Sequence, residues 1–230
     1  MAKRRIIADF APKVTRALKN ADQYHERYYA VKTFGGPSLH FHRRALGLEG
    51  SVTPAVRCEL IYGVLASWGM HRMGNGGSKM LPFKAFKTSM DATSAQVARA
   101  RRINPAVMSK ADWSVLESIF KTIRVMATGT SIVGNSKVMA HLLPNAVAPV
   151  DREYTLKFLF SNGNITNDLD QEWLLFRKIH EEFFYPIAND REFRIKAEKW
   201  VSDQGNLPWD TSVLKVIDNL VIGAMKGGTL

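Results

Sequence analysis

Residues 131–154 read SIVGNSKVMAHLLPNAVAPVDREY, and this stretch decides the predicted fold. Apolar residues recur at helical spacing across 135–143, which predicts a short helix there. Pro144 ends that helix, and Pro149 favours an extended backbone just before the aspartate that follows. Asp151 is suited to begin the next helix, because its side chain can accept a hydrogen bond from a free backbone N–H.

Helical periodicity continues on both sides of this stretch. Ser109 and Asp112 fit the start of a helix that runs to Ala127, and residues 128–134 are expected to form a tight connection to the next helix. Further helices are expected at about 9–32, 53–69, 82–101, 168–185, 190–203 and 210–226, with a glycine-rich loop at 74–78. We predict an all-α fold, a bundle of about nine helices in two packed lobes, with residues 1–230 as one unit.

The charge of the chain indicates the kind of partner. Its 32 Lys and Arg against 21 Asp and Glu leave a net charge of +11. A field of this sign attracts polyanions such as nucleic acid, although a basic protein that is merely kept soluble by its charge is the alternative. No apolar run is long enough to span a bilayer, and the N-terminus lacks the pattern of a secretory signal.

The residues that usually hold metals are sparse. The single cysteine, Cys58, cannot build an iron–sulfur cluster or a thiolate zinc site, and it suggests a reducing, cytoplasmic location. The six histidines show no metal-binding spacing. We therefore expect no metal and no cofactor.

The order of parts in residues 110–160 carries a family resemblance. A helix, a glycine-containing hairpin, a second helix, an apolar turn and then Val150-Asp151 resemble the helix-hairpin-helix superfamily of base-excision DNA glycosylases. That group includes endonuclease III and the 8-oxoguanine glycosylases. The resemblance implies a helix-hairpin-helix at about 110–143 and a catalytic-aspartate turn and helix at about 144–162. It also implies a monomeric enzyme that binds double-stranded DNA carrying a modified base.

The chemistry of glycosidic cleavage assigns roles to these residues. Breaking the bond builds positive charge on the sugar, which a carboxylate at Asp151 would stabilise. The backbone of the hairpin and the start of its second helix would grip a DNA phosphate. The residues expected at this grip are Gly134, Asn135, Ser136 and Lys137, and phosphate contacts are also expected from Arg101 and Arg102. An aspartate that serves only as a helix cap is the alternative.

The sequence also offers residues for a base pocket and indicates the type of cleavage. A flipped base needs aromatic faces and polar edges, which Trp68, His71, Arg72 and Tyr154 would supply, unless Trp68 simply packs in the core. Bifunctional members of the superfamily carry a lysine where an ungapped count places Ser136. This predicts a monofunctional enzyme that leaves an abasic site.

Several functions remain open at this stage. The chain looks similar to a bacterial branch that includes anti-phage glycosylases, which remove glucosylated 5-hydroxymethylcytosine from phage DNA. A glycosylase for 8-oxoguanine or another damaged base is the alternative substrate reading. A helix-hairpin-helix protein that binds DNA without catalysis is a second alternative, and an RNA-binding protein is a third.

Overall fold

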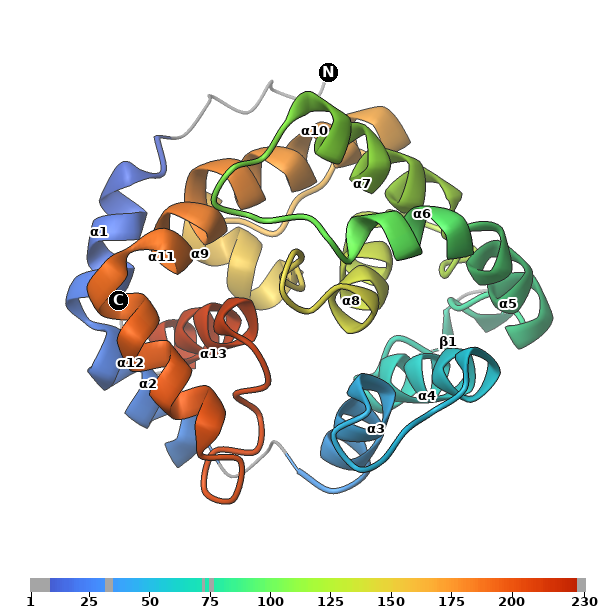
Figure 1. The fold of residues 1–230 in the computed structure, drawn as a ribbon. Helices are drawn as coiled ribbons and strands as arrows, with labels where there is room; N and C mark the ends of the chain where they lie inside the picture. The colour runs from blue at the N-terminus through green and yellow to red at the C-terminus, as the bar shows by residue number, and fades with distance from the viewer. Residues whose placement is uncertain (1–8, 32–34, 72, 75–76, 227–230) are drawn as a thin grey trace.

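The computed structural model describes residues 9–31, 35–71, 73–74 and 77–226, and these residues form a predominantly helical protein (Figure 1). The predicted all-α class is confirmed. The α-helices are α1 Ala11–Lys19, α2 Ala21–Ala30, α3 Pro37–Leu46, α4 Pro54–Ser67, α5 Phe83–Ala92, α6 Ser94–Ala100, α7 Lys110–Thr122, α8 Ile132–Leu142, α9 Lys157–Phe160, α10 Leu169–Ile179, α11 Tyr185–Asn189, α12 Arg191–Ser202 and α13 Val213–Lys226. Two π-helical segments, η1 Arg152–Leu156 and η2 His180–Phe184, lead directly into α9 and α11.

The predicted number of helices, about nine, is too low for the described part of the chain. The helix expected at 9–32 is divided at Asn20, whose side-chain amide donates to the carbonyl of Arg16 at 2.8 Å. The helix expected at 82–101 is divided at Thr93, whose hydroxyl donates to the carbonyl of Met90 at 2.8 Å. Such side chains compete with the backbone for its hydrogen-bonding groups, which favours a break. α3 was not predicted at all.

The glycine-rich segment differs in part from the predicted loop. β1 (Met73–Gly74) and β2 (Gly77–Ser78) form a two-residue antiparallel ladder. Close by, residues 79–81 pair with residues 125–127, through hydrogen bonds from Leu81 N to Val125 O and from Ala127 N to Lys79 O, each 2.8 Å. This pairing draws the backbone out of the helical conformation, which explains why α7 ends at Thr122 rather than at the predicted Ala127.

Segments far apart in the sequence lie side by side. α13 packs along α2, and α12 packs against α13, so helices from the early and the late part of the described chain lie side by side (Figure 1). α3 to α8 form a second set of contacts, in which α4 packs against α3, α5 and α8. α10 connects the two sets, because it packs against α7 and α8 and also against η2, which packs against α1 and α11. No helix in the described residues is long and apolar enough to cross a membrane.

The central part of the chain follows the prediction most closely. Ser109 and Asp112 form a reciprocal capping box at the start of α7, and the apolar face of that helix is buried. After α8 and a turn at residues 144–146, residues 147–150 form a buried segment without regular secondary structure. The hydroxyl of Tyr185 donates to Ala146 O at 2.7 Å, and Ala148 N donates to the ring of His180 at 3.0 Å. These bonds satisfy an irregular backbone that is buried.

Candidate functional site

Asp151 follows the buried segment 147–150 and immediately precedes η1, and its own backbone is extended, with φ −121° and ψ 147°. Its Oδ1 accepts a hydrogen bond from Glu153 N at 2.8 Å, which makes it the N-cap that the sequence predicted. Its own backbone N–H donates to Thr155 Oγ1 at 3.2 Å. The second carboxylate oxygen, Oδ2, points away from the cap. One residue therefore starts a helix and still presents a charged oxygen to its surroundings.

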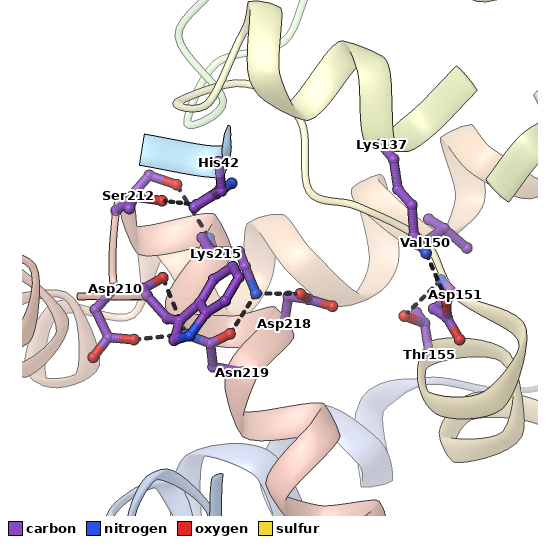
Figure 2. Close-up of polar contacts among 12 residues, drawn as sticks. His42, Lys137, Val150, Asp151, Thr155, Asp210, Ser212, Lys215, Asp218 and Asn219 are labelled. Carbon is purple, nitrogen blue, oxygen red and sulfur yellow. Dashed lines mark hydrogen bonds and ion pairs between the residues drawn. The ribbon is translucent and has the colours of Figure 1, made fainter. Parts of the chain in front are cut away.

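Lys137 of α8 meets that oxygen. Its Nζ lies 2.9 Å from Asp151 Oδ2, and Figure 2 shows the lysine reaching from α8 to the start of η1. The pair is largely shielded, with 11% of the Lys137 side chain and 24% of the Asp151 side chain exposed. The Nζ atom is also 5.3 Å from the centroid of the Trp68 ring, within range of a cation–π interaction.

The electrostatics of the pair favour an ionised acid. Burial alone would raise the pKa of Asp151, but the charge and hydrogen bond of Lys137, with the backbone N–H groups of Glu153 and Tyr154, outweigh it. The pKa of Asp151 therefore lies below its usual value. A carboxylate of this kind stays negative at neutral pH while partly removed from water, where its field acts strongly on a nearby positive charge.

Three of the residues predicted to grip phosphate are in the core. Gly134, Asn135 and Ser136 lie inside α8, which starts three residues earlier than predicted, and all three are buried. The prediction that they contact DNA is therefore wrong, because buried atoms cannot reach a phosphate. Lys137, the fourth, is also buried, and its ammonium group is engaged with Asp151 instead.

These buried residues hold the site together. Ser136 Oγ accepts from Val150 N at 2.9 Å, which fixes the segment that leads to Asp151 against α8. The Asn135 amide donates to Phe120 O at 2.8 Å and to Ile123 O at 3.2 Å, and so caps the end of α7. A Cβ on Gly134 would meet Val125 Cβ at 3.1 Å, so the glycine allows α8 to pack closely on the preceding connection.

The start of α8 is occupied by a carboxylate from elsewhere in the chain. Glu172 of α10 is buried, and its Oε2 accepts from Ser131 N and Ile132 N, each at 2.6 Å. An acid at this position satisfies two free N–H groups and complements the positive end of the helix dipole. The predicted backbone grip at this helix start is therefore already filled by Glu172.

Two of the predicted pocket residues come together and one does not. Trp68 is half-buried at the end of α4, and Tyr154 lies in η1, yet both pack against a cluster formed by Tyr28, Trp209 and Ile222. His71 is exposed, and its Nδ1 bonds to Ala66 O at 2.7 Å within the local turn, so the structure places it outside this group.

The three arginines predicted to contact DNA or the base are not part of this group in the described structure. Arg101 and Arg102 are exposed just after the end of α6, and neither is among the residues that contact the Lys137–Asp151 pair. Arg72 lies outside the described residues. Of the predicted site residues, the fold brings four together: Asp151, Lys137, Trp68 and Tyr154.

A buried histidine pair adjoins this group and was missed from the sequence. His42 Nδ1 lies 2.9 Å from His141 Nε2, and His141 Nδ1 lies 2.7 Å from Lys137 O. Both rings pack against Trp68, and the His42 ring also stacks on that of Trp209, 5.2 Å between centroids. Burial lowers the pKa of His42 well below its usual value and that of His141 to about 4, so both are neutral at pH 7.

A second missed element is a buried ionic network on α13. Lys215 Nζ lies 2.7 Å from Asp218 Oδ2 and also donates to Asn219 Oδ1 (Figure 2). Asn219 Nδ2 donates to Asp210 Oδ1 at 2.7 Å, and Asp210 Oδ2 lies 2.7 Å from His25 Nε2. Burial raises the pKa of Asp218, and the charge of Asp151 raises it further. The charges of the Lys137–Asp151 pair therefore act on this buried network through Asp218.

The region between these residues is compact. A cavity of about 10 Å³ is lined by Trp68, His42, His141 and Lys215 together with apolar and hydroxyl groups. The indole N–H of Trp209 is buried and has no hydrogen-bond partner among the described residues. Sequence reasoning had no signal for these contacts, because His42, His141 and Lys215 are separated by about a hundred and about seventy residues along the chain.

The described residues contain no group of three or more His, Cys, Asp or Glu side chains that could hold a metal ion. What the arrangement offers is one ionised carboxylate paired with an ammonium group, beside aromatic rings and buried polar groups.

Comparison of the chain with protein-family models, with curated proteins and with solved structures gave no match.

Proposed function

We propose that this chain is a DNA glycosylase of the helix-hairpin-helix type, which hydrolyses the N-glycosidic bond of a flipped modified base with Asp151 as its catalytic carboxylate. The observation that carries the proposal is the Lys137–Asp151 pair, an acid kept ionised beside the Trp68 ring. An ionised acid in a partly water-excluded site is the group needed to stabilise positive charge on a deoxyribose.

The proposed reaction needs only a water molecule besides these residues. The water oxygen forms a new bond to the sugar C1′ carbon, while the electron pair of the C1′–N bond leaves with the base. Asp151 stabilises the sugar cation and accepts a proton from the water. Lys137 holds the carboxylate in its ionised form and fixes its orientation.

The arrangement of the helices supports the same proposal. We assign α7, the bend at 123–131 and α8 to the helix-hairpin-helix, and we assign α3–α8 to one lobe. The other lobe would contain α1, α2 and α9–α13, and Asp151 lies where the chain passes from the first to the second. Trp68 and Tyr154, one from each side, would then enclose the flipped base.

The phosphate contact must be placed differently from the sequence prediction. Because Glu172 occupies the start of α8, we assign the contact to the exposed turn that precedes it. Gly129 in that turn has φ +80°, and a Cβ added there would meet nothing within 4 Å, so a phosphate can approach its backbone. Arg152 is exposed beside the turn, with Nη2 2.9 Å from Thr130 Oγ1.

Asp151→Asn tests the catalytic assignment. Asparagine can keep the helix cap but cannot supply a negative charge. We expect base release to fall by about 100-fold or more while the dissociation constant for DNA stays unchanged. Asp168→Asn is the matched control, because Asp168 caps α10 by accepting from Gln171 N at 2.8 Å and lies outside the site. Wild-type protein that binds DNA but releases no base would support the non-catalytic alternative.

The same assay identifies the substrate and the type of cleavage. Duplexes containing glucosylated 5-hydroxymethylcytosine, our first candidate, are compared with duplexes containing 8-oxoguanine by counting abasic sites. Release from 8-oxoguanine alone would contradict the phage-DNA assignment. We propose a monofunctional enzyme, and borohydride trapping tests this. A covalent complex formed by wild type but lost in Lys137→Met would show that Lys137 forms a Schiff base.

A further inference from the structure

A separate cavity lies away from the Lys137–Asp151 pair. It has a volume of about 330 Å³ and lies between the start of α4, the end of α5, α6 and Leu142 of α8. None of its lining residues belongs to the group around Asp151. Its size is at the lower end of the range of small-molecule sites.

Two arginines line this cavity without an acidic partner. Arg57 of α4 and Arg101 at the end of α6 form no ion pair with any carboxylate in the described residues. The Nε atom of Arg57 is buried and has no hydrogen-bond partner in the part of the chain that the structure describes. Burial, and then the charge of Arg101, lower the pKa of Arg57, so the two guanidinium groups repel each other across the site. A bound anion would remove that repulsion.

The remaining walls indicate what else the ligand carries. Much of the lining is apolar, with contributions from Val52, Pro54, Met90, Val97, Ala98 and Leu142. Asp91 also lines the cavity, and its charge is balanced by Lys87, whose Nζ lies 2.6 Å from Asp91 Oδ2. Asp91 can therefore accept a hydrogen bond from an amino or hydroxyl group without repelling an anion strongly.

We propose that this cavity binds a small phosphomonoester of the size of a nucleoside monophosphate. The phosphate lies between the guanidinium groups of Arg57 and Arg101, whose planar forks match phosphate oxygens. The body of the ligand packs on the apolar wall, and its amino or hydroxyl group donates to Asp91. The proposal does not depend on the glycosylase assignment.

Calorimetric titration at fixed ionic strength tests the proposal, with deoxyadenosine monophosphate, deoxyadenosine and inorganic phosphate as probes. We expect the monophosphate to bind, deoxyadenosine to show no binding, and inorganic phosphate to bind more weakly than the monophosphate. Arg57→Gln and Arg101→Gln should each weaken the monophosphate at least 10-fold. Arg102→Gln is the control, because it removes the same charge from the neighbouring exposed residue, which does not line the cavity.

Three results would overturn the proposal. The first is no binding of the monophosphate by wild type, and the second is equal weakening by Arg102→Gln, which would indicate a general effect of charge. The third is displacement of the monophosphate by duplex DNA together with loss of DNA affinity in Arg57→Gln, which would make the cavity part of a DNA surface. Asp151→Asn should leave the titration unchanged, so this proposal and the catalytic one can fail separately. Arg101 is exposed, so Arg101→Gln keeps the test open even if Arg57→Gln is poorly folded.

Discussion

Gly223 sets the distance between α13 and α2, and its replacement by alanine is a severe test of the packing. A Cβ built on Gly223 would lie 1.9 Å from Tyr24 O, 2.9 Å from Tyr24 C and 3.0 Å from Tyr28 N. All three atoms belong to the backbone of α2, so no side chain can rotate to make room. α13 also carries Lys215 and Asp218, so the same contact positions the buried ionic network.

The expected cost follows from these distances. Ordinary contact begins near 3.4 Å, so the two helices must separate by about 1.5 Å at this point. Overpacking of a core costs about 1–3 kcal/mol, and a rigid backbone neighbour places Gly223→Ala at or above the upper end. Alanine gains about 1 kcal/mol over glycine inside a helix. The net loss is then about 2 kcal/mol or more, which corresponds to a fall in Tm of about 4–8 °C for a chain of this size.

Gly63→Ala is the matched control for this measurement. Gly63 is also inside a helix, but its added Cβ would meet the Phe41 ring at 3.5 Å, an ordinary contact. We expect the Tm of Gly63→Ala to stay unchanged or to rise slightly, because only the helix-propensity gain applies. Thermal and urea unfolding of wild type and both variants give the comparison. Equal stability of the two variants would refute the close approach of α13 to α2.

Two further predictions concern ionisation. Lys137→Met should raise the pKa of Asp151, because the cation that offsets the burial of this carboxylate is removed. Carbon-detected NMR titration measures this pKa. An unchanged value would argue against the ion pair. The protein should lose stability as the pH falls below about 6.5, because burial lowers the pKa of His42 and brings those of His141 and His180 to about 4. The folded state then binds fewer protons than the unfolded one, so stability is complete above pH 6.5 and falls as the pH drops toward 4. The loss is about 1.4 kcal/mol per pH unit for each histidine, and equal urea midpoints at pH 7 and pH 5 would contradict it.

Local sequence signals predicted the parts of this protein that depend on near neighbours. The helical class, the helix start at Ser109 and Asp112 and the N-cap at Asp151 all appear in the structure. Each depends on hydrogen bonds or steric limits within about four residues. Periodicity and capping residues report such interactions directly.

Tertiary packing decided which of the candidate residues are accessible. Gly134 and Ser136 have the same chemistry in an exposed hairpin as in a buried helix, and only the position of α8 against its neighbours places them in the core. Glu172 reaches the start of α8 from 40 residues away, and His42 meets His141 from 99 residues away. Such contacts arise when the faces of distant helices pack together. The order of residues along one helix does not specify which distant face it meets, so these contacts could be found only in the folded structure.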